Sequence, residues 1–256
     1  MTTGKKQIFR CLQLVAGLAV LGGLCWGAYS VVLYVKASPR FEVRKLSVSG
    51  LRRVDDNQVL AKAGFEVGTN VFNVNLREIR ERVEQIKWVR HALVERVLPD
   101  QIIIKVVERE PIGLGRIHGE IYQFDADAVI LDPDPTVGTN SPILDGLGAD
   151  TTRNVKKVEL YRKVLEDIAD TSLSEIHISD NDEVSVVEAG DPMMVSLGTA
   201  DYRARWIRYL QLRPQIQQQY PQAVRVDLRF RNQVIVRMKD DETGEKFTWD
   251  VEKKSL

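Results

Sequence analysis

Charged side chains are absent from one long segment near the N-terminus and are spread over the rest of the chain. From Cys11 to Val35 there is no Asp, Glu, Lys, Arg or His. A helix needs roughly 20 apolar residues to cross the hydrocarbon core of a bilayer, and it satisfies its own backbone hydrogen bonds there. The pattern predicts a transmembrane helix over residues 11–35, preceded by a short tail of residues 1–10.

The charges beside this segment predict its orientation. Lys5, Lys6 and Arg10 lie in a tail that has no acidic residue. Short basic tails stay in the cytoplasm, whereas long domains are translocated largely regardless of their charge. We therefore expect a cytoplasmic N-terminus and an external C-terminal region. A cleaved signal peptide is the alternative, although its apolar region is only about 7–15 residues long. A lipoprotein is excluded because Leu24, which is not small, precedes Cys25.

Apolar periodicity in residues 40–109 predicts a strand, two helices and then two strands. Residues 41–49 are rich in β-branched and aromatic side chains, and Asp55 and Gly64 are typical start and stop signals of a short helix. A second helix is indicated by the spacing of Leu76, Ile79, Val83 and Ile86. Two further apolar runs flank a Pro99-Asp100 turn. This order predicts an α+β domain with two helices on one face of a three-stranded sheet.

Short apolar runs in residues 110–239 predict a second, β-rich domain with two inserted helices. The runs expected to form strands are 112–117, 121–124, 129–131, 173–178, 184–187 and 195–197. One helix is indicated by Val155, Val158, Tyr161, Leu165 and Ile168. The other begins near Asp201 and is expected to bend or stop at Pro214, because proline lacks the backbone donor that a helix needs. Residues 240–256 are polar and predict a loosely held C-terminal tail.

The last two runs of the second domain alternate between apolar and polar residues. In the first run the apolar residues are Val226, Leu228 and Phe230. A turn is expected at Asn232-Gln233, and in the second run the apolar residues are Val234, Val236 and Met238. The basic residues between and beside them are Arg225, Arg229, Arg231, Arg237 and Lys239, against Asp227 alone. The last strand of a domain is often a sheet edge, which either needs protection or accepts a partner strand. The sequence leaves both interpretations open.

Composition narrows the chemistry of the external region. The chain has a formal net charge of zero, and its basic tail makes the remainder slightly acidic. Nucleic-acid binding needs clustered positive charge, so we expect no nucleic-acid partner. The only cysteines, Cys11 and Cys25, lie inside the apolar segment. Disulfides and thiol chemistry are therefore excluded outside it.

Motifs for catalysis are absent as well. The histidines, His91, His118 and His177, have no motif partners, and there is no nucleophile elbow, zinc-protease motif or phosphate-binding glycine loop. The aspartates that invite a calcium site are Asp125, Asp127, Asp132 and Asp134, but Pro133 and Pro135 interrupt any regular loop. We predict that the protein is not an enzyme and has no cofactor, no metal site and no small-molecule substrate.

Residues 88–111, WVRHALVERVLPDQIIIKVVEREP, resemble the POTRA-domain signature of FtsQ/DivIB-type bacterial cell-division proteins. That signature runs as a Trp-Val pair, a strand, a Pro-Asp or Pro-Asn turn, an apolar strand and an acidic residue shortly before proline. Residues 41–75 resemble the family's opening, with Gly68 and Asn70 in place, and residues 203–214 are similar to a helix of its second domain. Leu98 departs from the Trp that many members have before this proline.

The resemblance implies a single-pass protein of the bacterial inner membrane, with a POTRA domain at 40–109 and an FtsQ-type β domain at 110–239, both periplasmic and at the division septum. It implies an adaptor that links upstream division proteins, through the POTRA domain, to FtsB and FtsL, through the β domain. Such an adaptor helps to control septal peptidoglycan synthesis. Together with the interpretation of the last strand as a sheet edge, the resemblance implies that a partner binds there by strand addition. The candidate partner-binding residues are then Arg229, Phe230, Arg231, Val234, Val236, Arg237 and Met238.

Two alternatives come from other functional classes. One is a POTRA protein of polypeptide transport or envelope assembly, although such chains usually carry repeated POTRA units or a membrane barrel. The other is a membrane-anchored cell-wall hydrolase, which a peptidoglycan digestion assay would reveal.

Overall fold

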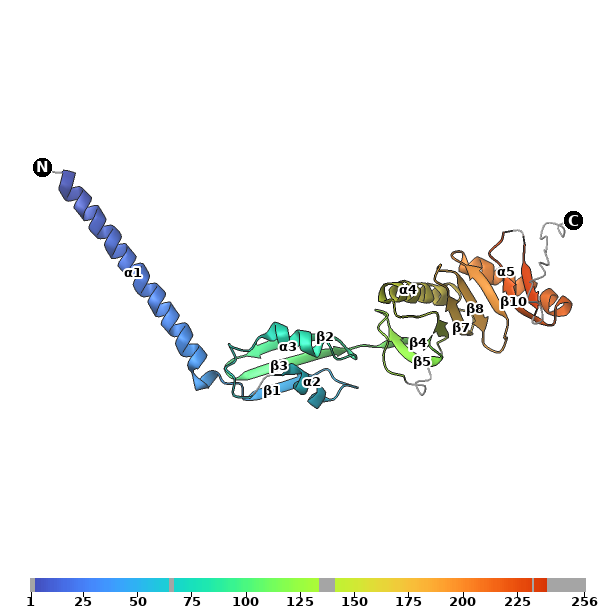
Figure 1. Cartoon of the computed structure of the whole chain (residues 1–256), viewed down its shortest axis with the longest axis horizontal. Coiled ribbons are helices and arrows are strands. Elements are labelled where there is room, and N and C mark those ends of the chain that lie inside the picture. The colour runs from blue at the N-terminus through green and yellow to red at the C-terminus, as the bar shows by residue number, and fades with distance from the viewer. Residues whose placement is uncertain (1–2, 65–66, 134–140, 232, 239–256) are drawn as a thin grey trace. The chain divides into compact units, whose positions relative to one another are not determined.

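The computed structural model describes residues 3–64, 67–133, 141–231 and 233–238, with side chains described from residue 17 onward. Its contacts divide the chain into two compact units, one ending at Arg109 and the other starting at Glu110. Each unit has its own hydrophobic core. Figure 1 shows the elements of both units.

The first unit begins with one long helix, α1 (Thr3–Ala37). Its stretch from Gly17 to Ala37 has a mean hydropathy of 1.8 and is long and apolar enough to cross a membrane. None of that stretch is buried by the rest of the protein. An all-round apolar helix needs an apolar environment, so this one is suited to lipid. A short 3-10 helix, η1 (Pro39–Phe41), follows and is capped by the hydroxyl of Ser38.

The first domain has the predicted order of strand, two helices and two strands. The elements are β1 (Lys45–Ser49), α2 (Asp56–Ala63), α3 (Leu76–Val83), β2 (Val89–Val97) and β3 (Gln101–Glu108). The strands lie in the order β1-β3-β2. The β1 strand is parallel to β3, whereas β2 is antiparallel to it. The prediction of an α+β domain is confirmed.

Local sequence explains where these helices begin and end. The Asp55 carboxylate accepts a hydrogen bond from the backbone of Asn57 at 2.8 Å and so caps the start of α2. Gly64 ends α2 with a φ of 62°, which is a left-handed conformation that glycine adopts easily. The Asn75 side chain accepts from the backbone N–H of Glu78 at the start of α3. One buried cluster, which includes Val59, Ile79, Ile102 and Ile104, joins both helices to the sheet.

The second domain is built on one mixed sheet of eight strands. Its elements are β4 (Pro111–Ile117), β5 (Glu120–Asp125), β6 (Ile143–Asp145), α4 (Thr151–Asp167), β7 (Leu173–Ile178), β8 (Val184–Glu188), β9 (Met194–Gly198), α5 (Tyr202–Gln219), β10 (Ala223–Asp227) and β11 (Ile235–Met238). The strand order is β11-β10-β9-β8-β7-β6-β4-β5. The expected β-rich domain with two inserted helices is confirmed.

Both helices pack on the same face of this sheet. A row of residues in direct register across six strands is buried, namely Leu144, Ile176, Val186, Val195, Val226 and Val236. Residues paired in register point to the same side of a sheet. The same core contains Tyr161 of α4 and Trp206 and Tyr209 of α5. The opposite face of the sheet carries no helix among the described residues.

Some details differ from the sequence predictions. The α5 helix continues through Pro214 to Gln219, because Ile216 in its last turns is buried in the core. Residues 129–131 form no full strand; only Ile130 makes an isolated bridge, to Phe124. Val155 lies on the solvent side of α4, where it is 48% exposed, while the buried face of the helix begins with Asn154 and continues through Lys157 and Val158. The expected turn residue Asn232 and the basic residue Lys239 lie outside the described residues.

Candidate functional site

The candidate site is the C-terminal edge, which we define as residues 223–238 without Asn232. The β11 strand is the end strand of the sheet and pairs with β10, with Val226 opposite Val236. No other strand of the described chain pairs with β11 on its outer side. Backbone donors and acceptors on such a side remain available to another strand.

The candidate residues divide into buried and exposed groups. Val234 and Val236 are buried in the core, so their side chains are closed to a partner. Phe230 is 45% exposed, because β10 ends at Asp227 and the alternation stops before it. Arg231 and Arg237 are exposed and Met238 is half-buried. The edge therefore offers backbone groups flanked by one aromatic ring and two cations.

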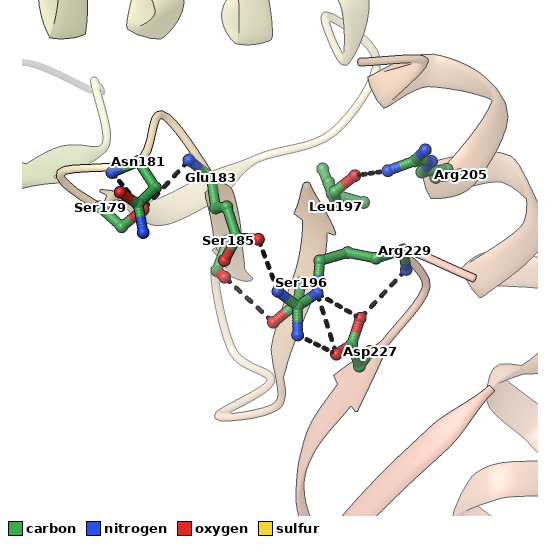
Figure 2. A network of polar contacts seen from close by, with 9 residues as sticks. All are labelled: Ser179, Asn181, Glu183, Ser185, Ser196, Leu197, Arg205, Asp227 and Arg229. Atoms are coloured by element: carbon green, nitrogen blue, oxygen red, sulfur yellow. Dashed lines mark hydrogen bonds and ion pairs between the residues drawn. The ribbon is translucent and has the colours of Figure 1, made fainter. Parts of the chain in front are cut away.

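Arg229 is engaged within the chain. Its guanidinium donates to the Asp227 carboxylate at 2.7 Å and to the Glu183 carboxylate at 2.6 Å. Figure 2 shows this side chain reaching from the end of β10 to both acids. The hydrogen bonds that Arg229 donates to Asp227 and Glu183 raise the pKa of Arg229. Arg229 thus joins the edge to the turn that precedes β8, and a partner carboxylate must compete with these two acids.

A polar row crosses the helix-free face of the sheet next to this edge. Its residues are paired in register and are Arg116, Asp145, His177, Ser185, Ser196 and Asp227. A shallow cavity of about 340 Å³ lies over part of this row, lined also by Arg225 and Arg229. The hydroxyls of Ser185 and Ser196 are 3.1 Å apart there. The edge and the cavity together form one polar surface.

Arg225 is the cation of this cavity with the weakest internal partner. Its Nη2 donates to the thioether sulfur of Met194 at 2.7 Å. Thioether sulfur is a weak acceptor, so this contact leaves most of the charge of the guanidinium uncompensated. Arg225 can therefore add positive charge to the edge.

The other end of the polar row is internally neutralised. His177 lies between Asp145, at 2.8 Å from its Nδ1, and Glu175, at 3.0 Å from its Nε2. Arg116 donates to Glu175 at 2.7 Å, and this hydrogen bond lowers the pKa of Glu175. These four groups satisfy one another, so this end of the row is a structural cluster.

The connection between β10 and β11 is held from the helix side. The Nη1 of Arg208 donates to the backbone carbonyls of Phe230 and Arg231, at 3.2 and 2.8 Å. A hollow of about 220 Å³ lies here and is lined also by Arg205 and Leu228. Arg208 therefore holds the backbone at Phe230 and Arg231 in place.

Sequence reasoning missed four residues of this site, namely Glu183, Asp227 as an ion-pair partner, Arg208 and Arg225 as a cavity cation. Glu183 is far from Arg229 in the sequence, and no local pattern marks their pairing. The alternation of β10 did place Arg225 and Asp227 on the face away from the core, which was the one available signal.

The acidic side chains of the second domain were also candidate metal ligands. Among the residues that the structure describes, no group of three or more His, Cys, Asp or Glu could hold a metal ion. Within the 125–132 segment the Asp125 carboxylate has a turn role, because it accepts hydrogen bonds from the backbone N–H groups of Asp127 and Val129. Asp134 lies outside the described residues.

Fold and site define a class of protein: an apolar helix followed by a POTRA-type domain and a β-rich domain whose end strand, β11, has β10 as its one partner among the described residues. The sequence model of the FtsQ-type POTRA domain matches residues 41–109, and that of the FtsQ/DivIB C-terminal domain matches residues 115–229. The chain belongs to the FtsQ/DivIB family of cell division proteins.

Individual relatives agree with this assignment. The chain is 29% identical over 239 residues to cell division protein FtsQ of Koribacter versatilis, covering 87% of this chain and 68% of that one. It is 23% identical over 238 residues to FtsQ of Geotalea daltonii, covering 88% and 86%. A solved extracytoplasmic domain of the division protein DivIB from Geobacillus stearothermophilus matches 44% of this chain and 95% of its own length, at 18% identity and a TM-score of 0.30.

Proposed function

We propose that this protein is a non-catalytic adaptor of the division machinery that receives FtsB, with FtsL, by strand addition at the C-terminal edge. In this proposal α1 crosses the inner membrane with the N-terminus in the cytoplasm, and both domains lie in the periplasm at the septum. The POTRA domain contacts upstream division proteins. Partner capture then helps to control when septal peptidoglycan is made.

One observation carries the docking proposal: β11 ends the sheet with its side chains on one face locked into the core. A strand held in this way presents backbone groups of fixed position, so a partner strand gains hydrogen bonds without ordering the edge first. Arg231 and Arg237 supply charge for acidic partner side chains, which favours specificity and association rate. Phe230 supplies an exposed aromatic contact of the kind that dominates interface energetics.

The test is co-purification of FtsB with the full-length chain from membranes. Phe230→Ala and Arg237→Glu should each weaken capture, and Val236→Pro should abolish it by removing a backbone donor from the strand. Because Val236 is buried, its variant must be checked for folding by circular dichroism, and the exposed substitutions serve as the independent measure.

Two matched controls separate the edge from general surface effects. Val155→Ala removes an apolar side chain that is 48% exposed on α4, against 45% for Phe230. Arg162→Glu reverses an exposed charge on the same helix. Both controls should retain FtsB. The site would be refuted if FtsB still co-purified with all three edge variants, Phe230→Ala, Arg237→Glu and Val236→Pro.

The absence of catalysis is part of the proposal and has its own assay. The purified full-length protein should release no soluble fragments from peptidoglycan. Release that scales with protein concentration would favour the hydrolase alternative.

A further inference from the structure

The end of the POTRA domain that receives α1 gathers three chain segments. The backbone of Val43 bonds to Thr69 and Gly68, and Val71 donates to the carbonyl of Phe41. Asp100 accepts through its carbonyl from the backbone N–H groups of residues 44 and 45. Residues 41–45, 67–74 and 97–100 therefore form one surface, which we call the helix-proximal end.

This end is joined directly to the last turn of α1. The buried Asn70 donates from its side-chain nitrogen to the carbonyl of Val35 at 2.9 Å. On the other side of the loop, the guanidinium of Arg96 donates to the carbonyl of Val71 at 2.8 Å and also bonds to that of Val74. These contacts hold residues 70–74 rigidly beside the point where α1 ends.

Apolar side chains project from this surface without being covered. Val67 is 70% exposed, Leu98 is 58% exposed and Phe72 is 37% exposed. The Phe72 ring also contacts Phe41 edge-on, with centroids 5.3 Å apart. Exposed aromatic and aliphatic side chains next to the end of a membrane-spanning helix are suited to the headgroup region of a bilayer.

Exposed cations lie at the end of α1, in η1 and just before and at the start of β1. Lys36, Arg40, Arg44 and Lys45 are exposed, and none of them has an ion-pair partner among the described residues. Two half-buried carboxylates, Glu42 and Asp100, lie in the same segments. The cations outnumber them, so the surface complements negative charge.

We propose that the helix-proximal end of the POTRA domain docks onto the anionic phospholipid surface from which α1 emerges. The inference rests on the proposed membrane insertion of α1. Only residues 38–44 separate α1 from β1, so the surface cannot leave the headgroup region without breaking the Asn70 contact. Docking holds the domain against the membrane at a fixed height.

The test uses the full-length chain with Cys11→Ala and Cys25→Ala, reconstituted in lipid nanodiscs. A single Asn73→Cys carries a polarity-sensitive fluorophore within the helix-proximal end. Gln85→Cys carries it at the opposite end of the domain, just before the start of β2, where Val89 pairs with Glu108 at the end of β3. Both positions are exposed.

In discs of phosphatidylethanolamine with phosphatidylglycerol, lipid-borne quenchers should reduce the emission at position 73 and leave position 85 unaffected. The double change Arg40→Glu and Arg44→Glu should abolish this quenching, and Leu98→Ser should weaken it. Val107→Ser is the matched control, because Val107 is 57% exposed near the other end of β3.

Three results would overturn the inference: equal quenching at positions 73 and 85, quenching unchanged by charge reversal, or quenching equal in phosphatidylcholine discs. Failure of the chain to enter the discs at all would overturn the membrane insertion as well. Normal incorporation with an unquenched position 73 would overturn the docking alone.

Discussion

At the scale of single residues, Glu108 bonds to three consecutive backbone N–H groups of the first domain. Its carboxylate accepts from the backbone N–H groups of Arg52, Arg53 and Val54, at 2.9 to 3.1 Å. Partial burial tends to raise the pKa of Glu108, but these three donors outweigh it and lower the pKa. The acid of the family signature is thus a clamp on the loop after β1.

We predict that Glu108→Gln destabilises the first domain by about 1–3 kcal/mol near neutral pH, because charged hydrogen bonds are lost. A carboxylate with a lowered folded pKa stabilises the fold above its ordinary pKa, and this contribution disappears as the pH falls through the folded pKa. Urea unfolding at several pH values should therefore show the variant and parent converging in acid. Glu81→Gln, which removes only an exposed pair with Arg77, should cost about 0.5 kcal/mol or less.

Arg229 allows a second prediction at this scale. Glu183 competes with any partner carboxylate for this guanidinium, and both side chains are substantially exposed. Glu183→Ala should therefore change stability by less than about 1 kcal/mol. It should also tighten binding of an acidic partner, which surface-immobilised FtsB would report. Weaker binding in Glu183→Ala would instead mean that Arg229 serves only to shape the edge.

The C-terminal edge was predicted from the sequence only in part. Alternation in residues 223–238 correctly separated the buried Val226, Leu228, Val234 and Val236 from the arginines. The same alternation predicted that Phe230 would be buried as well, and this was wrong: β10 ends at Asp227, whose carboxylate bonds to Arg229, and Phe230 is exposed. Pairing of Arg229 with Glu183 depends on strand order, which periodicity does not encode.

At the scale of elements, β4 depends on having no side chain at Gly113. A Cβ there would lie 2.7 Å from the Phe124 ring and 2.9 Å from the Tyr161 hydroxyl. Those rings pack edge-on at 5.4 Å, and burial raises the pKa of Tyr161 to about 12. The strand, its neighbour β5 and helix α4 thus meet at one point.

Gly113→Ala should destabilise the second domain by about 1–3 kcal/mol through overpacking. Gly148→Ala is the control, since nothing lies within 4 Å of a Cβ at that position. Thermal unfolding followed by circular dichroism would compare the two variants. Equal melting temperatures would show that the aromatic pair can move aside.

Elements with strong local signals were predicted well. The α2 helix starts after Asp55 and ends before Gly64, and α3 starts after Asn75, as the sequence predicted. Helix caps act over only a few residues, so they can be recognised from local sequence. Of the two outcomes expected at Pro214, a bend or a stop, the stop does not occur, because tertiary burial of Ile216 keeps the helix going beyond a missing hydrogen bond. The parallel pairing of β9 with β10 is of the kind that a connecting helix such as α5 allows, but the order of elements alone does not show that these two strands are neighbours.

At the scale of the whole molecule, the two separate cores predict separate responses to mutation. Ile104→Ala empties part of the first core and Ile176→Ala part of the second, and each should cost about 2–5 kcal/mol. Hydrogen exchange measured on the full chain should show faster exchange only in the domain that carries the change. Faster exchange in both domains would mean that their folding is coupled.

The parallel pairing of β1 with β3 has a mechanical consequence. The chain enters the POTRA domain at the start of β1 and leaves it at the end of β3, and the two strands are joined in register from Lys45 opposite Gln101 to Ser49 opposite Lys105. Tension between α1 and the second domain would pull these neighbours in opposite directions along their length. All the bonds between them are then loaded together in shear, and none can be unzipped first. A division protein that is stretched between a membrane and its partners would resist force at this pair of strands.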